Sequence, residues 1–312
     1  MDYMENYINE DGILNFGLND KNAKLIDEFY KKNPFPNYKS YENLNDFINE
    51  SEKNIFLSNL KKFIGYNKKI VEIGSGTSQL GIYLAANTNN KVYCLDATLE
   101  SLKLGKNFAR KNNINNVFFL RADIEKKIFK KNDFDFVICT GVIHHTSNPY
   151  ENFKYLSKLV RDNGRIIIGL YNKIGRTQTF LRQIIYKVIH FLGISTHLQN
   201  LITNYLDPYL RNNKLSIDKK NAWIKDQYDH PLEKSFTFDD LIKWFENNNI
   251  ELTGSIPSLN LFVSSKTNLF ELDYKTTYFE RLFKQFLMIF NNYGKEGGLF
   301  IMSGKKIDDQ KK

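Results

Sequence analysis

The stretch Lys69–Gly81 constrains the fold more than any other part of this chain. Residues 69–73 are mostly apolar, as in a buried strand. Gly74-Ser75-Gly76 predicts a tight turn, and Gln79–Ala86 predicts the helix that leaves it. A strand that enters a helix through glycines lets the backbone approach a ligand closely and points backbone N–H groups at it. The stretch therefore predicts a nucleotide-type cofactor site in an α/β fold.

Two side chains beside this turn indicate which cofactor it would take. The dinucleotide fingerprint G-x-G-x-x-G would require a third glycine where the chain has Gln79. Glu72, inside the end of the strand, would repel a pyrophosphate and suits a cofactor with cationic groups. S-adenosylmethionine carries an ammonium, a sulfonium and no phosphate. These residues disfavour a dehydrogenase and favour S-adenosylmethionine.

The run Val71-Glu-Ile-Gly-Ser-Gly-Thr resembles the first motif of the class I S-adenosylmethionine-dependent methyltransferases. Ser78 stands where many members carry a third glycine, and because serine is small we expect the same loop with closer side-chain contact. The resemblance covers residues 69–171 and 236–305. It implies an α/β, Rossmann-like, doubly wound fold with a seven-stranded, mostly parallel sheet. It also implies that the loop residues Glu72, Gly74, Gly76, Ser78 and Gln79 bind the cofactor.

Acidic residues stand at the ends of the next two predicted strands. Asp96 ends the strand 91–96 and comes 20 residues after Gly76, a spacing that suits hydrogen bonds to both ribose hydroxyls. Asp123 follows the strand 116–121, and the resemblance implies that it binds the adenine amino group. The remaining predicted cofactor contacts are Ala97, Ile124 and Thr140.

His144 and His145 directly follow the predicted fourth strand, residues 133–140, at the edge where open α/β sheets bind ligands. Histidine is the usual base when a hydroxyl acceptor must lose its proton, so both are candidate catalytic residues. They could instead only shape the cofactor pocket. A metal site is not expected, because adjacent histidines seldom converge on one ion and no H-x-x-x-H supports them. Weaker pocket candidates are Tyr171, Tyr228, Asp229 and His230.

The pattern of helices and strands predicts four parts. These are a helical N-terminal cap (1–65), the cofactor half of the core (66–171), a helical and loop insertion that forms a lid (172–235), and the completion of the sheet (236–312) with a helical insertion at 257–297. In the cap, helices are expected over 22–32 and 44–63. Residues 222–231 are expected to form a loop over the site.

Two amphipathic helices leave alternatives open. Thr177–Leu192 is basic with one apolar face, which favours packing on its own domain, although such a helix can also lie on a membrane surface. Thr277–Phe290 carries an aromatic stripe that is typical of a core helix, but the stripe could also line an apolar pocket or a dimer contact. The sequence leaves the oligomeric state open.

Composition limits the partners and the cellular compartment that are expected for this chain. The net charge of +9 permits an anionic partner, but the lysines are scattered, so no nucleic acid partner is expected. No apolar run is long enough to cross a bilayer, and no apolar signal segment begins the chain. Cys94 and Cys139 both lie in predicted core strands, so a disulfide is not expected. These features predict a cytoplasmic protein.

The runs 141–149, 169–176 and 226–231 resemble bacterial small-molecule methyltransferases related to those of quinone biosynthesis. The resemblance implies an enzyme that methylates oxygen, nitrogen or carbon of a metabolite, with S-adenosylmethionine as the cofactor. An RNA or protein methyltransferase is the first alternative. Against it, the fourth strand is not followed by an Asn-Pro-Pro-Tyr tetrapeptide, and no RNA-binding module is appended. A non-catalytic cofactor-binding protein is the other alternative.

Overall fold

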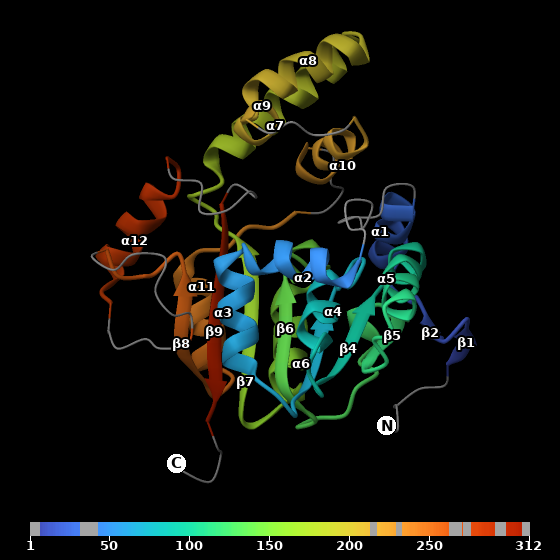
Figure 1. The fold of residues 1–312 in the computed structure, drawn as a ribbon. Coiled ribbons are helices and arrows are strands. Elements are labelled where there is room, and N and C mark those ends of the chain that lie inside the picture. Colours follow the sequence, from blue (N-terminus) through green and yellow to red (C-terminus); the bar gives the residue numbers. More distant parts are fainter. Residues whose placement is uncertain are drawn as a thin grey trace.

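One mixed sheet organises the chain, in the strand order β1-β2-β5-β4-β3-β6-β7-β9-β8 (Figure 1). The computed structural model describes residues 7–31, 43–212, 217–228, 233–261, 270, 276–290 and 298–307. Five neighbouring strands are parallel: β3 (Lys69–Ile73), β4 (Lys91–Asp96), β5 (Val117–Ala122), β6 (Phe134–Thr140) and β7 (Val160–Tyr171). The central strand β3 pairs with both β4 and β6, so the strand order reverses there. This reversal is where open α/β sheets bind ligands.

Helices cover both faces of the sheet because successive strand residues point to opposite sides. Ile70 and Val92 pack under α2 (Leu44–Glu52), α3 (Ile55–Ile64), α4 (Gln79–Ala85) and α5 (Leu99–Lys111), while Val71 packs on the face covered by α6 (Pro149–Leu159) and α11 (Phe238–Glu246). The expected α/β, doubly wound fold is confirmed. Asn148 caps α6 with Pro149 at its first position, and Thr237 forms a capping box on α11, both as the sequence predicts.

The described residues hold nine strands, two more than the seven predicted. The extra strands are β1 (Ile8–Glu10) and β2 (Ile13–Gly17), so the N-terminal segment is not wholly helical. Asp11 and Gly12 turn the hairpin with positive φ angles, and β2 pairs in parallel with β5. The hairpin is stabilised because Ile13 and Phe16 are buried in the core. α1 (Lys21–Lys31) follows it.

The predicted long helix over 44–63 is two helices. α2 ends at Glu52, and Asn54 caps α3 by accepting hydrogen bonds from the backbone N–H groups of Phe56 and Leu57. At the other edge of the sheet, β9 (Leu299–Lys306) lies antiparallel between β7 and β8 (Ile250–Ile256). Cys94 and Cys139 are buried, free thiols in β4 and β6, so no disulfide joins them.

An insertion of four helices stands above the carboxyl ends of the strands (Figure 1). It comprises α7 (Thr177–Phe191), α8 (Thr196–Leu206), α9 (Pro208–Asn212) and α10 (Ile217–Tyr228). The loop predicted over 222–231 is wrong for 222–228, which form the end of α10; residues 229–231, with Asp229 and His230, lie outside the described part. The hydrophobic periodicity of the sequence did not predict α10, because polar contacts hold this helix in place. The buried Asp207 accepts hydrogen bonds from Trp223 Nε1 at 2.8 Å and Tyr228 Oη at 2.7 Å.

α12 (Tyr278–Leu287) lies beside the β8 edge, and its aromatic stripe is not core (Figure 1). Phe279, Phe283 and Phe286 are exposed, while Lys284 and Gln285 are buried. The polar face is turned inward because Gln285 Oε1 accepts hydrogen bonds from Asn172 Nδ2 and from the Phe238 backbone N–H. In the described part of the chain, no helix has the length and apolarity needed to cross a membrane.

Candidate active site

The glycine loop between β3 and α4 has a conformation that only small residues accept. Gly74, Gly76 and Ser78 all have positive φ, at 68°, 53° and 63°. A Cβ on Gly74 would lie 2.2 Å from Cγ2 of Val142, in the turn after β6, so a side chain there is excluded by space as well as by φ. Ser78 is fully buried, with its hydroxyl 3.1 Å from that of Ser75. Gln79 begins α4.

Glu72 lies under this loop, and its position is set by the first turn of α4. Its Oε2 accepts a hydrogen bond from the Gly81 backbone N–H at 2.8 Å, and Cys94 Sγ lies 3.8 Å away. Burial, with a smaller contribution from the charge of Asp96, raises the pKa of the Glu72 carboxyl from 4.5 to about 8, against the opposing effect of the Gly81 hydrogen bond. The carboxyl is therefore protonated at neutral pH until a positive charge comes near it.

Asp96, at the end of β4, holds the loop from the other side. Its Oδ2 accepts from the Gly76 backbone N–H at 2.7 Å and its Oδ1 accepts from the Thr98 N–H at 2.7 Å. Burial raises the pKa of this carboxyl, while these backbone hydrogen bonds oppose the rise. The Thr98 side chain also donates to this carboxylate, and these three hydrogen bonds leave part of its acceptor capacity unused, since a carboxylate has about four acceptor positions. Ala97 follows, and its carbonyl accepts from Arg121 Nε at 3.1 Å.

Asp123 holds two segments of the backbone together, a role that the sequence did not predict. Its Oδ2 accepts from the backbone N–H groups of Asn19 at 2.6 Å and Asp20 at 3.3 Å, and its Oδ1 accepts from that of Lys126 at 2.9 Å. The carboxylate thus fixes the segment after β2 to the end of β5. Ile124 is buried beside it. The N-terminal hairpin therefore reaches the same edge as Glu72 and Asp96.

The turn after β6 faces the glycine loop and carries both histidines. Thr140 ends β6, and Gly141 follows with φ at 76°. His144 is fully buried and His145 is 8% exposed; their ring centroids lie 4.1 Å apart, and the His144 ring lies 4.2 Å from that of Tyr171. Val142 joins this turn to the glycine loop because it packs against Gly74.

The insertion is fastened to this turn through Arg176, which is buried. Its guanidinium lies 3.6 Å from the centroid of the Tyr171 ring and pairs with both carboxylate oxygens of Glu233, at 2.8 and 2.9 Å. Gln227 accepts from Arg176 Nη1 at 3.1 Å. The next residue of the chain after Glu233, Lys234, donates its backbone N–H to the His144 carbonyl at 3.0 Å. Helix α7 thus starts against the histidine turn.

Sequence reasoning placed Tyr171 near the site, and the structure brings it there. Tyr228 lies instead in the interior of the insertion, against Tyr186 and Asp207. Arg176, Gln227 and Glu233 were missed as site residues. Arg176 and Gln227 lie in the runs 169–176 and 226–231 that resemble small-molecule methyltransferases, but nothing in the sequence reveals that Arg176 pairs with Glu233, 57 residues away.

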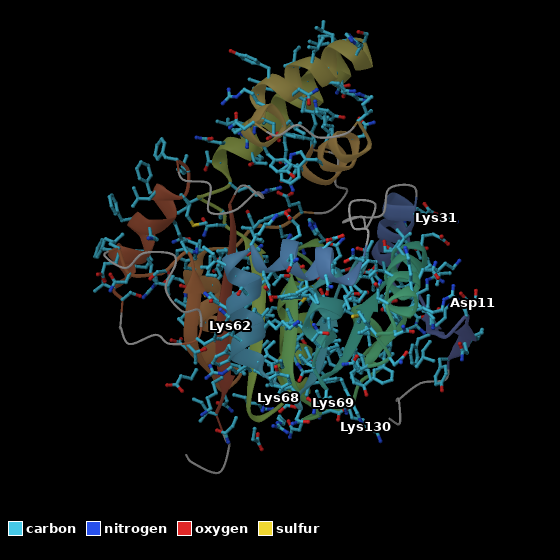
Figure 2. The ribbon with its side chains drawn as sticks, in the orientation of Figure 1. Asp11, Lys31, Lys62, Lys68, Lys69 and Lys130 are labelled. Atoms are coloured by element: carbon cyan, nitrogen blue, oxygen red, sulfur yellow. The ribbon has the colours of Figure 1, made fainter. Side chains whose placement is uncertain are left out.

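Basic residues gather at the opposite, amino edge of the sheet. Figure 2 shows Lys68, Lys69 and Lys130 together there. A cavity of about 460 Å³ lies beside α6 and is lined by Lys127, Lys130, Lys131, Glu151, Lys154, Tyr155 and Lys158. None of these residues belongs to the glycine loop or the histidine turn. Among the residues that the structure describes, no cluster of histidine, cysteine and acidic side chains could hold a metal ion.

The side chains present suit S-adenosylmethionine. Two carboxyls, Glu72 and Asp96, flank a loop that a cofactor can approach closely, and a phosphate group would meet both of them. Glu72 would hold the cationic end, and Asp96 would accept from ribose hydroxyls with its remaining acceptor positions.

Comparisons with known proteins agree with this assignment. A family model described as a methyltransferase domain matches residues 64–233, more than half of the chain. The chain therefore belongs to the class I S-adenosylmethionine-dependent methyltransferases, as its first motif suggested.

Individual relatives are distant. A ubiquinone biosynthesis O-methyltransferase of Rickettsia akari is 30% identical over 105 residues, which are 34% of this chain and 41% of that protein. PKMT2 of Rickettsia typhi, solved with AdoHcy, has a TM-score of 0.55 at 16% identity, covering 81% of this chain and 52% of its own. Magnesium protoporphyrin IX methyltransferase of Synechocystis PCC 6803, solved with SAH, has a TM-score of 0.51 at 12% identity, covering 91% and 99%. The chain spans about half or less of the length of the two Rickettsia proteins.

Proposed function

We propose that this protein transfers a methyl group from S-adenosylmethionine to an oxygen, nitrogen or carbon atom of a small-molecule metabolite. One observation carries the proposal. The glycine loop, with Glu72 and Asp96 on its two sides, lies directly against the turn that holds His144 and His145, through the contact of Gly74 with Val142. A cationic cofactor and an acceptor bound there would be neighbours.

The cofactor, when bound, supplies a methyl group on a sulfonium with a good leaving group, so the protein has mainly to position the acceptor and exclude water. Gly74 and Gly76 give close backbone approach, Glu72 meets the cationic end, and Asp96 holds the ribose. The remaining proposed contacts are Ser78, Gln79, Ala97, Asp123, Ile124 and Thr140. The insertion, held by Arg176, covers the histidine turn against water.

The two histidines are proposed to share one proton-transfer task. His145 keeps some exposure and is the better group to take a proton from a hydroxyl acceptor. His144 is fully buried between His145 and Tyr171, so it is the better group to hold the His145 ring in place. A base acting near neutral pH requires a ring that can be protonated and still reach solvent or substrate.

The acceptor is proposed by chemical class only. The Rickettsia akari relative is named for ubiquinone biosynthesis and the Synechocystis enzyme for magnesium protoporphyrin IX. Both names refer to organic molecules of low molecular weight, which supports a metabolite as the acceptor here.

The test is a transfer assay with S-adenosylmethionine labelled in its methyl group and a cell extract separated into metabolites, RNA and protein. We expect label in the metabolite fraction, with turnover reduced at least about a hundredfold by His145→Asn and the loss depending on pH. Label in RNA or protein would favour the macromolecular alternative. Cofactor binding without transfer to any fraction would favour a binding protein.

A further inference from the structure

The outer surface of the helical insertion is apolar and lies open. Helix α7 turns its inner side, including Thr179 and Ile189, toward the rest of the insertion. Its outer side carries large apolar residues that are exposed, from 41% at Ile185 to 88% at Phe191. We call the following set the insertion patch: Phe180, Leu181, Ile184, Ile185, Val188, Phe191 and Leu192 on α7 and the turn after it, with Leu198, Leu201 and Tyr205 on α8. The expectation that α7 packs on its own domain is thus wrong for most of its apolar face.

The exposed charges along α7, α8 and α9 have a single sign. Within residues 172–212, the exposed charged side chains are Lys173, Lys187 and Arg211, while Arg182 points into the insertion and donates to Thr179 Oγ1 at 2.9 Å. The one carboxylate in this range is Asp207, which is buried in hydrogen bonds to Trp223 and Tyr228. On α7, Lys187 lies one helical turn before Phe191 and directly beside the apolar stripe formed by Phe180, Ile184 and Phe191.

We infer that the insertion patch binds the surface of a lipid bilayer that carries anionic headgroups. An interfacial helix buries its apolar face at the boundary of headgroups and acyl chains, and cations on its flank meet the negative lipid charge. The patch supplies both parts. Figure 1 shows α7 and α8 standing away from the sheet, so a flat surface can reach them before the core.

A second copy of the chain fits these features less well. In a two-fold symmetric contact the same patch meets itself, so the cations of both copies, including Lys187, would enter one interface with no exposed carboxylate of residues 172–212 to pair with them. Like charges brought together in this way oppose association, whereas anionic lipid attracts every one of them.

Docking through the patch would place the bilayer on the side of the sheet where the strands end and where the histidine turn also lies. Helix α7 begins at Arg176, which is bonded to Glu233 and stacks on Tyr171 beside His144. The insertion is therefore attached to the turn by buried contacts. Binding to lipid does not depend on the methyl transfer proposed above, and it is measured without it.

The experiment is sedimentation of the full chain with vesicles, either of phosphatidylcholine alone or of a mixture with about one-third phosphatidylglycerol. We expect binding to the mixed vesicles, weaker binding to phosphatidylcholine, and loss of binding at high salt. Phe191→Ser/Leu192→Ser should weaken binding at least about tenfold, since both side chains are exposed and leave the core intact. Lys187→Gln should weaken it about fivefold.

Tyr66→Ser is the matched control, because Tyr66 is a large exposed residue (64%) far from the insertion in the chain. It should bind mixed vesicles as the wild type does. Absence of wild-type binding to mixed vesicles, or equal loss in the control and in the Phe191/Leu192 variant, would overturn the inference. The patch would instead be assigned to a second copy under two conditions. The wild type would be a dimer in light scattering that does not bind vesicles, and the Phe191/Leu192 variant would be a monomer.

Discussion

Replacing Glu72 by glutamine tests the electrostatics of the glycine loop. Glutamine has nearly the same shape and can still accept the Gly81 N–H hydrogen bond, but it cannot ionise. Burial raises the pKa of the Glu72 carboxyl to about 8, so the folded protein keeps a proton that the unfolded chain releases above its ordinary pKa of 4.5. The stabilisation from the neutral carboxyl is complete below pH 4.5 and is lost as the pH rises to about 8.

The size of this effect follows from the two pKa values. A rise in the pKa from 4.5 to about 8 lowers the free energy of unfolding by roughly 5 kcal/mol above pH 8, and by about 3 kcal/mol at pH 7. Glu72→Gln carries no such cost. The variant without cofactor should therefore exceed the wild type in free energy of unfolding above pH 7, and the difference should grow by up to about 1.4 kcal/mol per pH unit between pH 5 and 8.

The assay is urea unfolding of both proteins between pH 5 and 9, with the exposed Glu246→Gln as the control. The control should follow the wild type at every pH. A difference between Glu72→Gln and wild type that does not change with pH would refute the raised pKa. The same variant should bind S-adenosylmethionine more weakly, and it should not show the proton release that we expect when the wild type binds this cation at pH 7.

Two further substitutions test the packing of the site. Gly74→Ala should destabilise the fold by at least about 2 kcal/mol more than Gly141→Ala in urea unfolding, because both positions have positive φ but only Gly74 faces Val142; equal losses would contradict the steric argument. Arg176→Met leaves Glu233 without its buried partner, which should cost about 3 kcal/mol and speed proteolysis within residues 177–235; an unchanged proteolysis rate would contradict the fastening of the insertion.

The local signals in the sequence predicted much of the fold. A strand, a glycine turn and a helix in direct succession specify one supersecondary unit, so β3, the loop and α4 were found where they lie. Capping residues such as Asn148 and Thr237 act within three residues of themselves, and both were placed correctly. All seven predicted strands are present.

The errors involve contacts between distant parts of the chain. The Asp11-Gly12 turn signal is local, but the strand it creates is stabilised by pairing with β5, more than a hundred residues later. The stripe on α12 correctly indicates an amphipathic helix, yet periodicity cannot tell which face meets the protein, and Gln285 reverses the usual choice through its bonds to Asn172 and Phe238. The pairing of Arg176 with Glu233 has no local signal at all.

The most direct test of the cofactor site is calorimetric binding of S-adenosylmethionine, S-adenosylhomocysteine, NAD and NADP to the wild type and to Asp96→Asn. We expect that only the first two bind the wild type, and that Asp96→Asn weakens their binding at least about tenfold, since it removes acceptor capacity proposed to face the ribose. Thermal melting of the variant without ligand checks that it is folded. Binding of NAD or NADP, or equal affinity of the folded variant for S-adenosylmethionine, would contradict the cofactor site described here.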